Sequence, residues 1–417
     1  MLSPNAVLPP SPRVLLVMRH FVESFSQLPD LLANAGIHVD VVGTARVRHM
    51  RHCAAVGKFT EIGDGAEGFS RELSAEVGGQ QYDSIILVDE PALNGVLDAL
   101  HNNESVPSSC LPFDLDAPLA AVLGSKARFY EFCQQHDIRL PATHMATSRD
   151  EAEEIALRIG FPCVLKGTTG SGGQSVYMIN NREELSHQLT HWNYGLPIIV
   201  QQYIAGVAAA ATFFSFKGEL RAWMATANVL SLNDGKGPKV AARFLCDPAI
   251  QAACEKFARL GNYTGITGFD FMLSDSGEVY IIDPHFGRLT ALSHMGLYCG
   301  VDFGVCLRDA LQGKATVHHP QPTDITAVKF PECVNYALTG GFWKLMRVAS
   351  PFSSRTRYCI NPRLGLRFNL TLAGKSVLKS LRWRQNVAIG AIRKPLSRVK
   401  QAMLKTAAML RQQTKVA

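Results

Sequence analysis

The fold of this chain is decided by the stretch Val164-Leu165-Lys166-Gly167-Thr168-Thr169-Gly170-Ser171-Gly172-Gly173-Gln174-Ser175-Val176 and by a second stretch further along, Gly268-Phe269-Asp270-Phe271-Met272-Leu273 with Gly277-Glu278-Val279-Tyr280-Ile281-Ile282-Asp283-Pro284-His285. The first stretch offers a cation and a flexible run of backbone N–H donors. The second offers two carboxylates on neighbouring strands. Together they supply the groups that hold a nucleoside triphosphate and its magnesium ion.

Lys166 comes at the end of an apolar strand, where its ammonium group needs an anionic partner such as a phosphate. The glycines that follow permit positive φ and close backbone approach. The N–H groups of Gly170-Ser171-Gly172-Gly173 are therefore expected to converge on phosphate oxygens. The alternative is a plain hairpin turn, which a glycine-rich loop taken alone favours.

Asp270 and Asp283 flank a turn at 274–277, so a hairpin would set the two carboxylates side by side. Two like charges are costly there unless a cation lies between them, and magnesium takes carboxylate oxygens together with phosphates. By strand alternation His285 shares a face with Asp283 and is a candidate third ligand or hydrogen-bond partner. Taken alone, the acid pair fits two surface acids at strand ends equally well.

The composition is that of a globular protein of several domains. The chain has 417 residues, of which 47% are hydrophobic and 18% charged. No apolar run reaches the roughly 20 residues that span a bilayer, and residues 1–20 lack a signal-peptide pattern. The ten cysteines contain no Cys-x-x-Cys pair, so we expect reduced thiols in a cytoplasmic protein.

Alternating strands and helices predict a parallel α/β sheet at the start of the chain. No Gly-x-Gly-x-x-Gly follows the first strand, which argues against a dinucleotide site. Ser148-x-x-Glu151 and Asn180-x-x-Glu183 are predicted to open two helices. Strands are expected at 13–18, 37–42, 83–88, 162–166, 175–179, 196–202, 210–216 and 221–228, and further helices at 24–35, 126–136 and 248–260.

The order and spacing of these motifs resemble the ATP-grasp superfamily, which includes D-alanine–D-alanine ligase, biotin carboxylase and carbamoyl-phosphate synthetase. The resemblance covers about residues 115 to 310. It implies that Lys126 in Gly-Ser-Lys-Ala-Arg and Lys166 in Gly-Phe-Pro-Cys-Val-Leu-Lys contact ATP phosphates. It also implies an adenine hinge at Gln201-Gln202-Tyr203-Ile204 and magnesium ligands at Asp270 and Asp283.

Several positions depart from the family's pattern. The usual Glu-x-Asn is Asp283-x-His285, and manganese would tolerate the imidazole better than magnesium. The usual arginine two residues later falls on Gly287, with Arg288 as the nearest substitute. The acidic residue expected to hold the ribose is replaced around Gly206-Val207-Ala208. Further cations expected near the phosphates are Arg243, Lys236 and Lys239, all of which also fit ordinary solvated charge.

The C-terminal part of the chain is strongly basic. Residues 341–417 hold seventeen Lys/Arg and no Asp or Glu, which leaves 25 Lys/Arg against 35 Asp/Glu in the rest. Apolar spacing predicts helices at 376–392 and 396–410. Cationic amphipathic helices suit an anionic membrane surface, an acidic protein or the acidic remainder of this chain, with nucleic acid behind these.

We therefore expect an α/β protein with a Rossmann-like domain at 1–113, an ATP-grasp core at 114–315 and a basic, largely helical extension at 316–417. The core divides into a small lobe at about 126–200 and a large lobe at about 201–315. The resemblance implies an ATP- and Mg²⁺-dependent carboxylate–amine ligase acting through an acyl phosphate, with Lys166, Arg288 and Arg243 as catalytic residues. The alternative is a nucleotide-binding sensor or assembly partner at the inner face of a membrane. The two substrates and the oligomeric state stay open, although dimers are common in the family.

Overall fold

The N-terminal part of the chain forms a parallel sheet. The computed structural model describes residues 10–20, 23–102, 110–113, 115–168, 175–193, 195–232, 239–290, 292–360, 365–375 and 377–378. The first sheet has the order β3-β2-β1-β4, and every pair in it is parallel, as predicted. Residues 14–18 of β1 are buried because helices cover the sheet. Its elements are β1 (Arg13–Met18), η1 (Glu23–Gln27), α1 (Leu28–Asn34), β2 (His38–Gly43), η2 (Ala45–His52), β3 (Phe59–Glu61), α2 (Ala66–Gly78), β4 (Ser84–Leu87) and α3 (Glu90–His101).

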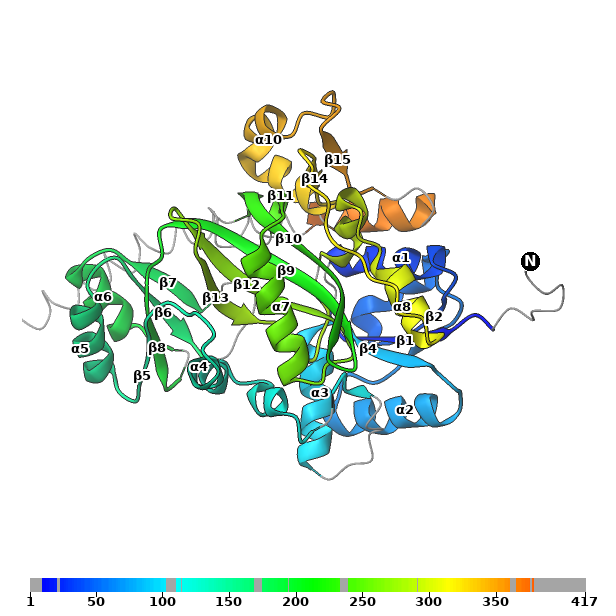
Figure 1. Ribbon diagram of the computed structural model, residues 1–417, viewed down its shortest axis with the longest axis horizontal. Helices are drawn as coiled ribbons and strands as arrows, with labels where there is room; N and C mark the ends of the chain where they lie inside the picture. Colours follow the sequence, from blue (N-terminus) through cyan, green and yellow to red (C-terminus); the bar gives the residue numbers. More distant parts are fainter. Residues whose placement is uncertain are drawn as a thin grey trace, which may run out of the picture.

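A second, antiparallel sheet forms the small lobe, with the order β5-β8-β6-β7. Helices α5 and α6 cover one face of it (Figure 1). The Ser148 hydroxyl accepts the Glu151 N–H at 3.1 Å and caps α5 as predicted. This part of the chain comprises η4 (Pro118–Val122), α4 (Lys126–Gln135), β5 (Thr143–Ala146), α5 (Arg149–Ile159), β6 (Cys163–Gly167), β7 (Val176–Ile179), α6 (Arg182–Thr190) and β8 (Ile198–Gln202).

The cap of α6 differs by one residue from the sequence prediction. Asn181, not Asn180, accepts the Glu184 N–H, at 2.9 Å. Asn180 instead donates its own N–H to the Glu184 carboxylate at 2.9 Å. Two adjacent asparagines followed by two adjacent glutamates make either register possible, and packing of Leu185 and Leu189 selects the one found.

The central sheet has seven strands in the order β13-β12-β9-β10-β11-β14-β15. Helix α7 packs against it through Phe257, whose ring lies 5.2 Å from Phe269 and 4.8 Å from Phe286. Its elements are β9 (Gly206–Phe216), β10 (Glu219–Ser231), β11 (Lys239–Leu245), α7 (Pro248–Leu260), β12 (Gly265–Ser274), β13 (Val279–Pro284), η6 (Ser293–Cys299), α8 (Phe303–Leu311), β14 (Thr326–Val328) and β15 (Thr356–Tyr358).

Residues that the sequence analysis placed in the C-terminal extension add two strands to this sheet. β14 pairs antiparallel with β11, and β15 pairs parallel with β14. Between them lie α9 (Glu332–Tyr336), a π-helical turn (Ala337–Gly341) and α10 (Phe342–Val348). A helix at 366–375 packs on η2, where the Phe368 ring stacks on His49 at 5.9 Å. The helices expected at 376–392 and 396–410 lie outside the described residues, except for 377 and 378.

All ten cysteines are described, and all are free thiols. Within the described ranges, no helix is both long and apolar enough to cross a bilayer.

Candidate active site

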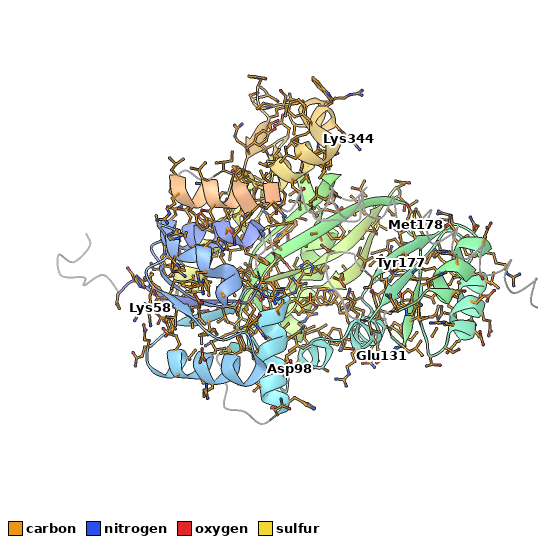
Figure 2. All side chains as sticks on the ribbon, turned by 180° about the vertical axis from the view of Figure 1, so that it is seen from behind. Lys58, Asp98, Glu131, Tyr177, Met178 and Lys344 are labelled. Carbon is orange, nitrogen blue, oxygen red and sulfur yellow. The ribbon has the colours of Figure 1, made fainter. Side chains whose placement is uncertain are left out.

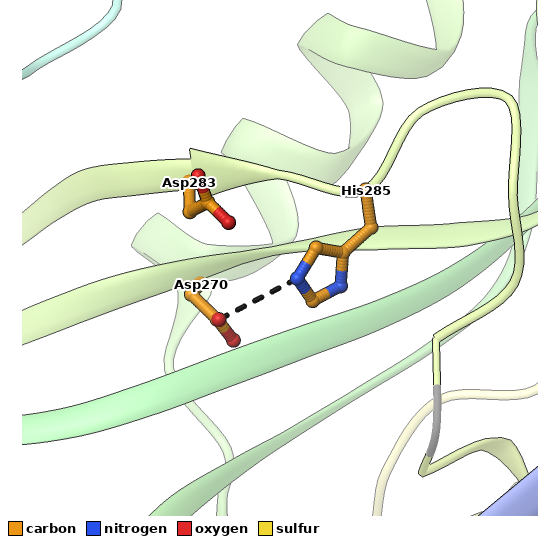
Figure 3. A group of neighbouring side chains, drawn as sticks. All are labelled: Asp270, Asp283 and His285. Carbon is orange, nitrogen blue, oxygen red and sulfur yellow. Dashed lines mark ion pairs between the residues drawn. The ribbon is translucent and has the colours of Figure 1, made fainter. Parts of the chain in front are cut away.

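The two predicted acids face each other across a hairpin. Strands β12 and β13 pair antiparallel with Asp270 opposite Asp283, and the register shifts directly after Asp270. Donor atoms of Asp270, Asp283 and His285 all lie within 4.8 Å of one another (Figure 3). The predicted grouping of these three side chains is therefore present in the fold.

Asp270 is held as a carboxylate by the cations around it. Burial alone would raise its pKa, but His285, Lys239 and Arg288 outweigh that effect and lower the pKa to about 2. Nε2 of His285 lies 3.4 Å from Oδ2 of Asp270. At neutral pH the site consequently presents an ionised carboxylate ready to accept a cation.

The donor set fits a divalent cation. Two carboxylates and one imidazole converge, and the backbone N–H of His285 is fixed by the Gly268 carbonyl at 2.9 Å. Nδ1 of His285 is buried and has no hydrogen-bond partner within the described part of the chain. Oxygen donors suit magnesium, and the nitrogen donor suits manganese better.

Two lysines reach the acids from the opposite side. Lys126, the first residue of α4, places Nζ 3.1 Å from Oδ1 of Asp283. Lys166, near the end of β6, is 7% exposed, and its Nζ donates to the Tyr130 hydroxyl and to the Ile282 carbonyl, each at 3.3 Å. The segments 126–166 and 270–283 thus meet at one place, as their resemblance implied.

Burial makes the charge of Lys166 costly. Desolvation and the nearby Lys126 lower the pKa of Lys166 to about 8, although Asp283 and Asp270 favour its charged form. Its two neutral hydrogen-bond acceptors do not neutralise the ammonium group. An anion arriving at this place would find a desolvated cation that no carboxylate of the described residues contacts directly.

Lys239 is a third cation beside the acids. Burial and Lys329 lower its pKa to about 8, whereas Asp270 favours the charged form. Its Nζ donates to the Thr226 carbonyl at 3.1 Å. The sequence analysis included Lys239 only as one of several further cations expected near the phosphates.

Lys329 and Glu332 were missed by the sequence analysis. They form an ion pair at 2.9 Å, and each residue is 4% exposed. The sequence does contain a pattern that could have identified Lys329 as a buried cation. Lys329 directly follows the short apolar strand β14, just as Lys166 comes at the end of an apolar strand. A strand of three residues has too little sequence pattern to be recognised by itself.

Gly287 stands where the family's arginine would be, and the structure gives a reason for the glycine. Its φ is +82°, and a Cβ there would lie 2.8 Å from Cδ1 of Leu93. Arg288, the nearest substitute in the sequence, lowers the pKa of Asp270 and approaches Glu90 at 3.6 Å. A pocket of about 140 Å³ lies here, with Glu90, Lys126, Asp283 and Arg288 among its lining residues.

The predicted adenine hinge lies at the end of β8. Gln201 is 2% exposed and donates its side-chain amide to the Thr143 hydroxyl at 2.8 Å, so that side chain is already engaged. The Gln202 N–H is bound by the Ala142 carbonyl. Within the described residues, the N–H groups of Tyr203 and Ile204 have no hydrogen-bond acceptor. At this hinge, the backbone N–H groups of Tyr203 and Ile204 are therefore the ones available to bind a ligand.

Other predicted residues are not joined to the acids. Arg243 is exposed on β11, and no hydrogen bond or ion pair within the described chain links its side chain to Asp270 or Asp283. Gly170, Ser171, Gly172, Gly173 and Lys236 lie outside the described residues. The two ends of the glycine-rich segment are close, because the Gly167 N–H donates to the Ser175 carbonyl at 3.0 Å.

Comparison with known proteins agrees with this geometry. A family model described as an ATP-grasp domain matches residues 123–284, the segment that carries both lysines and both acids. The chain contains a segment that matches an ATP-grasp domain. The resemblance stated from the motifs is thereby confirmed, and the Asp270–Asp283 hairpin is the last part of the matched ATP-grasp domain.

The curated relatives include large chains of carbamoyl phosphate synthase. The large chain from Helicobacter pylori is 38% identical over 73 residues, which cover 18% of this chain and 7% of that protein. The arginine-specific large chain from Bacillus subtilis is 22% identical over 235 residues, covering 52% of this chain and 22% of that protein. This chain thus matches less than a quarter of the length of either relative.

Solved structures share the fold. N5-carboxyaminoimidazole synthetase from Staphylococcus aureus superposes with a TM-score of 0.55 at 11% identity, covering 73% of this chain and 78% of that one. L-amino acid ligase from Bacillus licheniformis gives a TM-score of 0.53 at 14% identity, covering 73% and 75%. The structural similarity extends beyond residues 123–284, so these solved proteins share more of the α/β fold than the matched ATP-grasp domain.

Proposed function

We propose that this protein is an ATP- and magnesium-dependent ligase that joins a carboxylate to an amine through an acyl phosphate. The observation that carries the proposal is the meeting of Lys126 and Lys166 from one side with Asp270 and Asp283 from the other. Cations for phosphate and carboxylates for a metal ion are the two halves of a phosphoryl-transfer site.

Each group has a distinct role in this proposal. Asp270, Asp283 and His285 would hold the metal ion, which when bound neutralises phosphate charge. Lys126 and Lys166 hold phosphate oxygens, together with the N–H groups of 170–173. The N–H groups of Tyr203 and Ile204 receive the adenine edge, since neither has an acceptor within the described residues.

The acid substrate is placed beside Arg288 and Lys239. Both cations lie close enough to Asp270 to stabilise its charge, so they also stand beside the phosphoryl group that Lys166 would hold. A carboxylate oxygen attacks the γ-phosphorus, the bond to the bridging oxygen breaks, and ADP leaves. The amine nitrogen then attacks the acyl carbon, inorganic phosphate leaves, and the nitrogen loses a proton.

The names of the relatives and structural neighbours support a ligase. Carbamoyl phosphate synthase and L-amino acid ligase are among them. The departures at Asp283, His285 and Gly287 favour the second candidate, a nucleotide-binding protein with weakened or lost catalysis. The two candidates differ in one measurable property, which is turnover that depends on an acid and an amine.

The test measures ADP release from ATP with Mg²⁺ or Mn²⁺ in the presence of pooled carboxylic acids and amines. Release that requires both pools in the wild type and is absent in Asp270→Asn supports the ligase. Tight ATP binding with no turnover in any pool refutes the ligase and supports the nucleotide-binding candidate. Unchanged release in Asp270→Asn refutes the assignment of the site.

A further inference from the structure

The C-terminal part of the molecule carries the most exposed large apolar side chains of the described residues. The five most exposed large apolar side chains among the described residues all lie between 343 and 378. Trp343 is 80% exposed and Phe352 is 96% exposed. Figures 1 and 2 show α10, which carries Trp343, at the outer edge of the molecule in both views. We name the exposed side chains of the described residues 338–360, 365–375 and 377–378 the C-terminal surface.

The helix at 366–375 is apolar on two sides. Phe368 and Leu372 are fully buried against the N-terminal part of the chain, where Phe368 stacks on His49. Leu366 and Leu370, one turn apart, are 76% and 62% exposed. Packing within the chain explains why the buried side of this helix is apolar. It does not explain why the exposed side is apolar as well.

The same part of the chain exposes basic residues. Lys344 and Arg347 are exposed on α10 beside Trp343, and Arg357 is exposed on β15 (Lys344 is labelled in Figure 2). The sequence from 341 to the end contains no Asp or Glu to balance them. A neighbouring acid within the described residues is Asp324, which pairs with Arg355 at 2.8 Å. The C-terminal surface thus combines positive charge with exposed aromatic and aliphatic groups.

We propose that the C-terminal surface binds an anionic lipid bilayer from one side. Anionic headgroups attract Lys and Arg, whereas Trp and Phe enter the boundary between headgroups and acyl chains. The exposed leucines decide between lipid and nucleic acid, because aliphatic side chains gain from contact with acyl chains and make no hydrogen bonds to base edges. This binding is separate from the ligase proposal and does not depend on catalysis.

The test uses the full chain and sedimentation with vesicles of phosphatidylcholine, with or without phosphatidylglycerol. The variant Trp343→Ser/Lys344→Glu changes one exposed apolar residue and the basic residue after it. Its matched control is Leu157→Ser/Arg158→Glu on α5, which alters the same kinds of exposed neighbours in the small lobe. A second pair, Phe352→Ser and Met178→Ser, repeats the comparison with single changes. Thermal unfolding and ATP binding verify that each variant folds.

We expect the wild type and both controls to sediment with anionic vesicles and about tenfold less with neutral ones. The Trp343/Lys344 variant should lose about tenfold in affinity for anionic vesicles. Absence of wild-type binding to anionic vesicles overturns the proposal, as does equal binding by the variant and its control. Preferential binding of a single-stranded oligonucleotide over vesicles, or loss of self-association in the variant with no vesicle binding, overturns it in favour of another occupant.

Discussion

The two sides of the active site hold their charges in opposite ways. On the hairpin side, His285, Lys239 and Arg288 lie around Asp270, and its pKa falls to about 2 despite burial. On the β6 side, Lys166 has neutral hydrogen-bond partners, and burial lowers its pKa to about 8. The acid is stabilised in its charged form, whereas the lysine is not. The difference suggests that the hairpin is ready for its ligand, while the lysine gains a matching anion only when a phosphate arrives.

The hairpin side should show the largest loss of activity. Asp270→Asn removes the carboxylate on which the cations converge, and we expect ADP formation to fall about a thousandfold. Asp275→Asn, in the exposed turn of the same hairpin, is the matched control and should keep wild-type activity. Equal activity in the two variants would show that the hairpin acid has no part in turnover.

Lys166→Ala tests the other side and should lower ADP formation about a hundredfold, because one phosphate contact is lost while Lys126 remains. The exposed Lys314→Ala serves as its control. A loss larger than that of Asp270→Asn would reverse the ranking of the two sides.

Gly287→Ala examines the backbone that follows the hairpin. Gly277 has a φ of +84°, and a Cβ added there would meet nothing within 4 Å, whereas Gly287 has a φ of +82° and Leu93 at 2.8 Å. Gly277→Ala should cost about 1 kcal/mol of unfolding free energy from backbone strain. Gly287→Ala should cost about 2 kcal/mol more because of the steric overlap. Denaturant unfolding measures both, and equal costs would exclude the overlap as the reason for the glycine.

The pH profile examines the charge of Lys166 directly. Its pKa is lowered to about 8, and only the protonated form attracts phosphate, so kcat/KM for ATP should fall as pH rises through about 8. An unfolded lysine titrates near 10.4, so deprotonation between these values relieves the cost of the buried charge and raises stability. Thermal unfolding in the same buffers should therefore show no loss from this group. A rate that stays flat to about pH 9.5 would contradict a role for the charged form.

His285→Asn should have the smallest effect, because it replaces a nitrogen donor with an amide oxygen and leaves both acids in place. We expect the ratio of Mg²⁺-supported to Mn²⁺-supported ADP formation to rise about threefold. The ratio is measured on one enzyme preparation with each metal in turn. An unchanged ratio would indicate that the imidazole pairs with Asp270 and does not select the metal.

The sequence predicted those parts of the site that depend on neighbouring strands. Asp270 and Asp283 flank a short turn, so their pairing follows from hairpin geometry, and Lys166 ends an apolar strand that is easily recognised. Glu90 and Lys329 come from distant segments, and only tertiary packing brings Glu90 to Arg288 and Lys329 near Lys239. The strands β14 and β15 have three residues each, too short for a periodic pattern.

The domain bounds and the roles of Arg243 and of the glycine-rich loop stay predictions. Gly287 shows why the family's motif does not predict the residue at every position of this chain. Its neighbour Leu93 belongs to α3 of the N-terminal sheet, so the space for a side chain at 287 is set by a different part of the chain.

The ion pair between Lys126 and Asp283, at 3.1 Å, has a thermodynamic consequence. A metal ion that takes Asp283 as a ligand must end this pairing and leave the ammonium group without its counter-charge. A nucleotide that offers its phosphates to Lys126 removes that penalty in advance. Metal and nucleotide should therefore bind with positive cooperativity, each raising the affinity of the other by the same factor. The metal ion alone would compete with Lys126 for Asp283, and the nucleotide alone would compete with Asp283 for Lys126.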